Sequence, residues 1–290
     1  ALCRDRGGSV VEARDIAAAL SARRLRHDYP EQRLRESIAE GERLIELAGS
    51  RIGQINGLTQ IDLGDWRFGL PVRVSARTHA GGQGLLNIER EVEMSGPIHD
   101  KGVLILHSYL IALFGHLAPL ALNASVVFEQ EYNGVEGDSA SCAELFALLS
   151  SLSGVPLRQG IAVTGALNQH GEVLPVGGIN EKIEGWFRVC EAAGLDGQQG
   201  VLLPRRNLRH LMLDPSVVDA VAAGQFHIYT ASHAGEGLAL LTGMPSGIGD
   251  PLATHGPFPA GSVLARCEAQ LRQFREACRQ ASRSPGTSND

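Results

Sequence analysis

Residues 160–194 read GIAVTGALNQHGEVLPVGGINEKIEGWFRVCEAAG, and this stretch sets two apolar runs directly before a helix. The runs GIAVTG and GEVLPVGG are separated by ALNQH, which predicts a hairpin of two short strands. In INEKIEGWFRVCEAAG the apolar residues change to helical spacing, and Gly194 provides a stop. Further along, VLLP and FHIYT are strand-like, each followed by a helical segment. This order predicts an α/β fold with mixed sheets and helices.

Outward from this stretch, the chain divides into three parts. Residues 1–50 have helical periodicity and predict a short all-helical segment. Residues 51–245 change to short runs between turn residues, as in PVRVSAR, where apolar and polar residues alternate as in a half-buried strand. Residues 246–290 predict a linker rich in glycine and proline, an amphipathic helix and a disordered tail. We therefore expect one α/β domain with helical attachments at both ends.

Composition excludes several classes of function. The net charge of -6 makes nucleic acid an improbable partner, although the first 50 residues carry clusters of arginine. Five cysteines without a CxxC pair predict free thiols in a reducing compartment, hence a cytoplasmic protein, and no metal site. No GxxxxGK[ST] loop is present, so the chain itself holds no ATP through that loop.

Residues 102–128 contain no Asp, Glu, Lys or Arg and are long enough to suggest a membrane span. Two histidines, a proline and an asparagine interrupt them. A buried helix to about Gly115, followed by a loop and a strand into SVVFEQEY, explains the stretch with less strain. We therefore expect no contact with a membrane.

The stretch VEGDSASCAELFALL, residues 135–149, sets two serines and an aspartate before an apolar helix. Ser141 and Glu144 have the spacing of a capping box, and Asp138 can accept N–H groups at the same helix end. Ser139 is then left without a structural task, at a helix N-terminus that favours an oxyanion. It is a candidate nucleophile, although serine before a helix is common.

The chain contains 26 lysine and arginine residues, and only Lys101 and Lys182 are lysine. Because arginine cannot lose its proton, a retained lysine is a candidate for a catalytic amine. For Lys101, in the turn GPIHDKG, chance is a sufficient explanation for the presence of a lysine. If Asn180 caps its helix, Lys182 lies in the first turn, where the dipole disfavours a cation. Burial beside Trp186 would lower the pKa of this amine further, whereas nearby glutamates would oppose that change.

Two further groups of residues bear on the base. Thr164 ends the run GIAVTG, where its hydroxyl could orient the lysine amine, and a β-branched residue suited to a strand explains it equally well. His79 and His170 lie in expected loops. A Ser-His-Asp triad is disfavoured because the chain contains no GxSxG elbow.

Together these residues resemble the proteolytic domain of the Lon protease family, in its archaeal-type or Lon-like branch. The resemblance runs in order through IGQINGL at 52–58, GPIHDKGVLIL at 96–106, EGDSAS at 136–141, residues 154–183 and LLPRRNLRHL at 202–211. It implies a compact α/β domain that assembles as a homohexameric ring. Residues 1–50 would be the end of an AAA+ helical subdomain, and ATP and Mg²⁺ would belong to an ATPase part outside this sequence. The C-terminal extension does not align.

The resemblance also implies the roles of single residues. Ser139 falls on the nucleophile, Lys182 on the general base and Thr164 on the threonine that supports the lysine. Glu136 and Asp138 fall where branches of the family differ, and Asp138 would either position the lysine or shield a resting site. The expected function is a serine endopeptidase that degrades unfolded or damaged proteins. The alternative is a ring-forming scaffold or latent module whose serine and lysine are not in working geometry.

Overall fold

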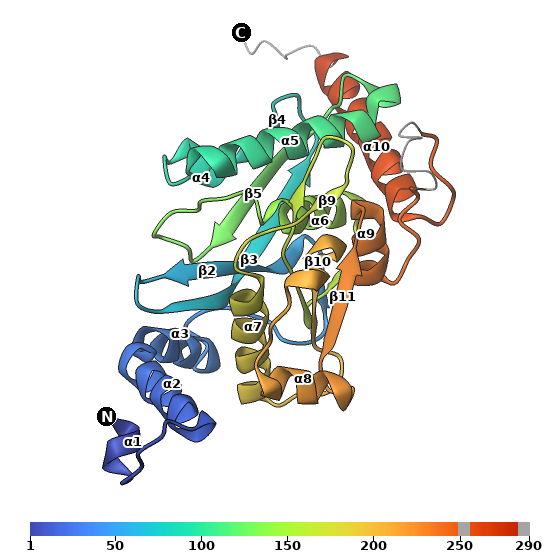
Figure 1. The fold of residues 1–290 in the computed structure, drawn as a ribbon. Helices are drawn as coiled ribbons and strands as arrows, with labels where there is room; N and C mark the ends of the chain where they lie inside the picture. Colours follow the sequence, from blue (N-terminus) through green and yellow to red (C-terminus); the bar gives the residue numbers. More distant parts are fainter. Residues whose placement is uncertain (249–255, 284–290) are drawn as a thin grey trace.

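The computed structural model describes residues 1–248 and 256–283 (Figure 1). The helices are α1 Leu2–Asp5, α2 Ala13–His27, α3 Tyr29–Ala39, α4 Ile88–Glu91, α5 Pro97–Leu113, α6 Ser141–Ser153, α7 Ile179–Ala193, α8 Pro215–Ala222, α9 Ala234–Thr242 and α10 Val263–Arg283, with short 3-10 helices at Gly115–Leu117 and Arg205–His210. The strands are β1 Ser50–Arg51, β2 Gln54–Asp62, β3 Arg67–His79, β4 Gly84–Asn87, β5 Asn123–Glu129, β6 Leu157–Arg158, β7 Ile161–Val163, β8 Ala166–Leu167, β9 Val173–Leu174, β10 Gly200–Pro204 and β11 His227–Ala231.

A seven-stranded mixed sheet forms the centre, in the order β11-β10-β7-β2-β3-β5-β4. The strands β11, β10, β7 and β2 are parallel to one another, β3 is antiparallel to both β2 and β5, and β4 lies parallel to β5. The predicted α/β class is confirmed. The long antiparallel pair β2 and β3 follows the alternation that PVRVSAR shows, since Val72, Val74 and Ala76 are buried.

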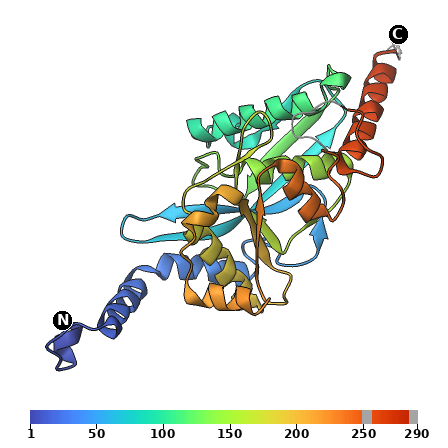
Figure 2. The same ribbon diagram turned by 45° about the vertical axis from the view of Figure 1, so that its right-hand side comes forward.

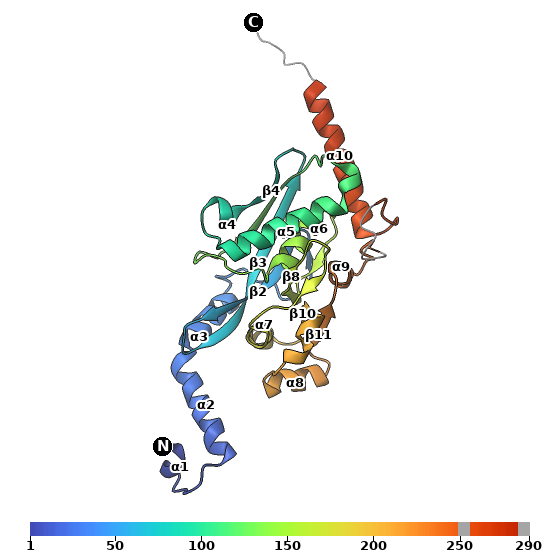
Figure 3. The same ribbon diagram turned by 45° about the horizontal axis from the view of Figure 1, so that its top comes forward.

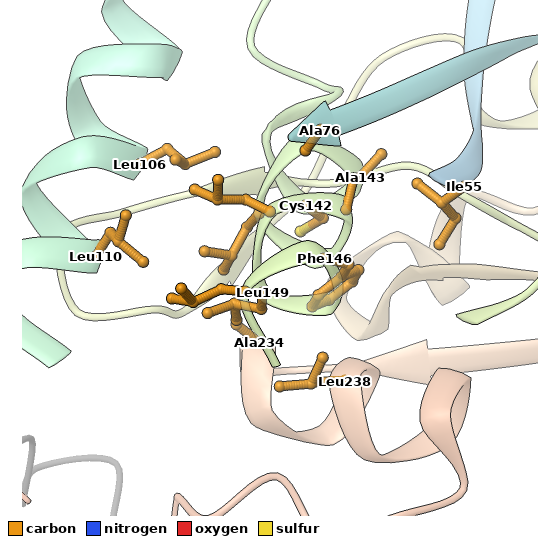
Figure 4. Packing of buried hydrophobic residues seen from close by; sticks show 14 of the residues in the cluster. Ile55, Ala76, Leu106, Leu110, Cys142, Ala143, Phe146, Leu149, Ala234 and Leu238 are labelled. Atoms are coloured by element: carbon orange, nitrogen blue, oxygen red, sulfur yellow. The ribbon is translucent and has the colours of Figure 1, made fainter. Parts of the chain in front are cut away.

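Helices cover both faces of the sheet. The larger apolar core includes α5, α6, α9 and the first half of α10, and a second core includes α7 and α8. The helix α6 is buried on nearly all sides, with Phe146 and Leu149 between side chains of α5 and α9 (Figure 4). An apolar helix of this kind needs neighbours all round, which explains why the C-terminal helix α10 packs on α6.

Two helical attachments lie at opposite ends of the molecule (Figure 2). The helices α1 to α3 lead into the domain, where α3 packs against α7. The far end of α10 extends beyond the domain (Figure 3). The predicted disordered tail begins at Ser282, but Ser282 and Arg283 still belong to α10. Residues 284–290 of that tail and residues 249–255 of the predicted linker lie outside the described residues.

The apolar stretch 102–128 follows its prediction. The helix α5 ends at Leu113, and the strand β5 begins at Asn123. Among the described residues, no helix combines the length and the apolar character that a membrane crossing requires.

The predicted hairpin is wrong in its first strand. The strand β7 from GIAVTG joins the central sheet beside β10 and β2, and the hairpin forms between the two-residue strands β8 and β9. The reason is burial: Ile161, Ala162 and Val163 are all buried, as in a parallel strand covered on both faces. The chain leaves the sheet at Thr164, whose N–H still donates to Leu202 of β10.

Candidate active site

Ser139 lies where β7 ends and α6 begins. Its carbonyl oxygen accepts a hydrogen bond from the Gly165 N–H at 2.7 Å and another from the Thr164 hydroxyl at 3.3 Å. The N–H of Cys142, in the first turn of α6, donates to the Gly165 carbonyl at 3.0 Å. The segment after β7 is therefore bonded to the Ser139 carbonyl and to the first turn of α6, which fixes the backbone on the C-terminal side of Ser139.

The predicted capping box at α6 is wrong. Ala140 is the N-cap residue, and no side chain caps this helix. The Ser141 hydroxyl donates to the Asp138 carbonyl at 2.7 Å instead, which closes the turn around Ser139. Glu144 lies 3.2 Å from His99 of α5. Because this helix end is buried against α5, the two side chains find partners outside the helix terminus.

The lysine is carried by α7, on the other side of the sheet from α6. The N-cap of α7 is Gly178, with φ at 63°, and not Asn180 as predicted. The Asn180 side chain instead contacts the 3-10 segment, with its amide donating to the His210 carbonyl and its oxygen accepting from Met212. Lys182 still lies in the first turn, so the expected unfavourable position for a cation is retained.

A close backbone contact brings α7 to the sheet. A Cβ on Gly185 would lie 1.9 Å from the Gly69 carbonyl oxygen of β3, and a Cβ on Gly69 would lie 2.2 Å from the Glu181 carbonyl oxygen. Neither position can accept a larger residue without moving the helix. On the outer side of α7, Arg188 bonds buried Glu31 of α3 at 2.8 Å. Helix α7 is thus held between β3 and the N-terminal helices.

The amine of Lys182 reaches both hydroxyls of the site. Its Nζ donates to Ser139 Oγ at 2.8 Å and to Thr164 Oγ1 at 3.2 Å. The lysine is 3% exposed and Thr164 is 1% exposed. Burial lowers the pKa of Lys182 to about 8, against the charge of Asp138, which raises it. We expected nearby glutamates to oppose this lowering of the pKa. The charge that raises the pKa of Lys182 belongs to Asp138 instead.

The structure separates the two acidic candidates. Asp138 immediately precedes Ser139, and its charge acts on Lys182. Glu136 is directed to the start of α5, where its Oε1 accepts from the Ile98 N–H at 3.3 Å. Its other oxygen occupies the space beside Gly96, because a Cβ there would overlap it. Only Asp138 belongs to the electrostatic surroundings of the lysine.

A pocket opens beside Ser139, and sequence reasoning did not find it. Leu58, Val72 and Phe128 come from three strands of the sheet, and Val135 and Ala140 come from the loop before α6. The carboxyl-bearing residues Glu131 and Glu136 also line it. The alternation within β3 marks Val72 as buried, but no local signal tells which buried side chains border a hydroxyl from another segment.

Two N–H groups at the site are available to a ligand. Within the part of the chain that the structure describes, the N–H groups of Ser139 and Ala140 have no hydrogen-bond partner. Those of Ser141 and Cys142 are occupied by the Asp138 and Gly165 carbonyls. The same described part contains no cluster of three His, Cys, Asp or Glu side chains suited to a metal ion. The groups that the site offers are a hydroxyl, an amine and peptide N–H groups.

Comparison with known proteins adds to this geometry. Residues 133–239 match the family described as the Lon protease (S16) C-terminal proteolytic domain. A Lon protease homolog of Escherichia coli (strain K12) is 42% identical over 236 residues, which cover 81% of this chain and 40% of that protein. One of Haemophilus influenzae is 35% identical over 237 residues, covering 81% of this chain and 39% of that protein.

A third relative is the archaeal Lon protease of Methanothermobacter thermautotrophicus. It is 30% identical over 224 residues, covering 76% of this chain and 32% of that protein. The chain thus spans less than half the length of these relatives. The matched region contains Ser139, Thr164 and Lys182 together with the loop before α6. Through this C-terminal proteolytic domain, the chain belongs to the Lon protease family.

Proposed function

We propose that the chain is a serine endopeptidase in which Ser139 and Lys182 form a catalytic dyad. The observation that carries this proposal is the 2.8 Å contact between Lys182 Nζ and Ser139 Oγ. A buried amine with a pKa of about 8 is partly neutral near physiological pH, and its lone pair can then accept the serine proton. Membership in a family of proteases supports the same reaction.

The reaction begins when Ser139 Oγ attacks the carbonyl carbon of the scissile peptide and its proton passes to Lys182 Nζ. The oxyanion that forms accepts hydrogen bonds from the free N–H groups of Ser139 and Ala140. The Lys182 ammonium then gives its proton to the leaving amine, which leaves an ester on Ser139. Water, deprotonated by Lys182, attacks this ester and releases the acyl product, which restores both residues.

Thr164 fixes the direction of the amine throughout this cycle. Its oxygen accepts from Lys182 Nζ, and its proton is donated to the Ser139 carbonyl. The hydroxyl thus bridges the base to the backbone of the nucleophile. A lysine side chain has four rotatable bonds, so this bridge reduces the entropy lost when Nζ reaches Ser139 Oγ.

The substrates and partners that we propose extend beyond this chain. Unfolded or damaged proteins are the proposed substrates, and a homohexameric ring is the proposed assembly. ATP and Mg²⁺ would act in an ATPase part, because neither lysine here follows a phosphate-binding loop. The helices α1 to α3 would join the two parts, since α3 packs against the helix that carries Lys182.

Cleavage of fluorescently labelled casein by the purified chain, without ATP, tests the proposal. We expect wild type to degrade casein, and Ser139→Ala and Ser139→Cys to lose most or all of the activity. Ser108→Ala is the control and should keep full activity, because the Ser108 hydroxyl is exposed on α5 and donates to the Leu104 carbonyl of its own helix. A wild-type ring without activity, or activity retained in Ser139→Ala, would favour the scaffold or latent alternative.

A further inference from the structure

Three buried titratable side chains lie behind the loop that carries Ser139 and take no part in the reaction above. Glu89 of α4 is 4% exposed, and His99 of α5 and Glu144 of α6 are each 1% exposed. Charged and polar side chains are rarely buried this deeply unless they serve one another or a site. The contacts of the three residues show where they act.

Glu89 and Glu144 hold opposite ends of one loop. Glu89 Oε1 accepts from the N–H of Phe128 at 2.7 Å, at the end of β5 and just before the loop. Glu144 Oε1 lies 3.2 Å from His99 Nε2, in the first turns of α6 and just after the loop. The His99 ring also meets the Phe128 ring edge to face, with centroids 5.4 Å apart. His99 therefore contacts both ends of the segment that presents Ser139.

The three residues are incompletely satisfied. Glu89 Oε2, His99 Nδ1 and Glu144 Oε2 are buried, and none has a hydrogen-bond partner within the described residues. A buried polar pair of this kind is usually no more stable than an apolar replacement of the same volume. Stability alone does not explain the cluster, so a role in fixing geometry is the better explanation.

A close helix contact connects His99 to the nucleophile. Gly102 lies one turn further along α5, and a Cβ there would be 3.0 Å from Ser141 Oγ and 3.1 Å from Asp138 Cβ. These two residues flank Ser139 on either side. A shift of α5 would therefore move the turn that holds the catalytic hydroxyl, because no space separates the two segments.

We propose that His99 is a positioning residue for Ser139, acting through Glu144 and Glu89, which fix the two ends of the loop at 130–140. The kinetic consequence rests on the proposed peptidase function. The effect of His99 on the order of the loop is independent of that function, and it can be measured in an inactive protein as well.

The charges around His99 make the stabilisation provided by His99, Glu144 and Glu89 depend on pH. Glu144 of α6, Glu89 of α4 and Asp100 of its own helix face the imidazole, and Phe128 of β5 adds no charge. Burial disfavours the imidazolium, but the hydrogen bond and charge of Glu144, with the other carboxylates, raise the pKa of His99 overall. The stabilisation is therefore fully present below the unfolded pKa and lost as pH rises through the folded pKa.

The test compares His99→Phe, Glu144→Met and the double variant with His116→Phe. His116 is the matched control, because it forms the same kind of pair with Glu268 of α10, at 3.3 Å, where it contacts the C-terminal helix. Hydrogen exchange of peptides covering 130–145 reports the order of the loop. The kcat and KM for a fluorogenic peptide, measured across pH, report its catalytic effect. Glu144→Met serves if His99→Phe does not fold.

We expect faster exchange at 130–145 and a kcat lowered about tenfold or more in both single variants, with KM changed little and His116→Phe unaffected. In the double variant the melting temperature should recover, since both buried polar partners are gone, whereas loop order and kcat should not. Unchanged exchange in the single variants would overturn the proposal, as would full recovery of kcat in the double variant. A wild type without peptidase activity would instead refute the proposed function, and loop exchange would still decide the role of His99.

Discussion

The two lysines of the chain lie near the N-termini of two helices, Lys101 in α5 and Lys182 in α7, and they differ in their surroundings. Both lie near a helix N-terminus, where the dipole disfavours an ammonium. Lys101 of α5 is exposed to solvent, whereas Lys182 of α7 is 3% exposed and bonded to two hydroxyls. Both lysines thus occupy similar positions in their helices. Burial and contact with hydroxyl groups distinguish Lys182 as the candidate base.

The largest effect should come from exchanging each lysine for arginine. Lys182→Arg should lower casein hydrolysis by roughly 10³-fold, because a guanidinium cannot take the serine proton. Lys101→Arg keeps an exposed cation and should leave the rate within about twofold. Initial rates of both variants, with circular dichroism to verify folding, check the comparison. Equal losses of activity in the two variants would show that the burial of Lys182 is unrelated to catalysis.

The next effect concerns pH. In the proposed mechanism the neutral amine is the active form. Because burial lowers the pKa of Lys182 to about 8, kcat/KM should rise about tenfold per unit below that pH and level off above it. Between pH 6 and 8 the change should be about 50-fold, because only half of the amine is neutral at its pKa. The profile of Lys101→Arg should overlay wild type. A flat profile over this range, with a peptide whose own charge is constant, would exclude Lys182 as the base.

Much of this site was predictable because the signals are local. The scarcity of lysine singled out Lys182, and the serine left over before an apolar helix singled out Ser139. Resemblance to one family joined these two residues to Thr164. The alternation in β3 and the apolar run of α5 likewise identified their elements, because burial of one face imposes its period on the sequence.

What sequence could not predict depends on segments that are far apart in the chain. The capping box at Ser141 failed because α5 supplies His99 to Glu144, and the hairpin failed because β10 pairs with β7. The contact between Gly69 and Gly185, which brings α7 to the sheet, joins positions more than 100 residues apart. Local patterns carry no information about such partners, so the contact between Ser139 and Lys182 emerges only from the folded chain.

A smaller effect should separate the two roles of the Thr164 hydroxyl. Thr164→Val preserves shape but removes the acceptor for Lys182 Nζ, and kcat should fall roughly tenfold, as for one lost hydrogen bond at a buried polar group. Thr164→Ser retains the hydroxyl and should keep most of the rate. The two kcat values, measured at pH 9 where the amine is largely neutral, make the comparison. Equal rates in both variants would leave Thr164 without a role in orienting the amine.

The smallest effect should come from the charge that opposes burial. Asp138 raises the pKa of Lys182, so Asp138→Asn should move the midpoint of the pH profile downward and increase the rate at pH 7 by roughly a few-fold. Glu181→Gln is the control, because Glu181 adjoins Lys182 in sequence but is not among the groups that shift its pKa. If the midpoint of the pH profile moved upward in Asp138→Asn, the contacts of this carboxylate would influence the pKa of Lys182 more than its charge does.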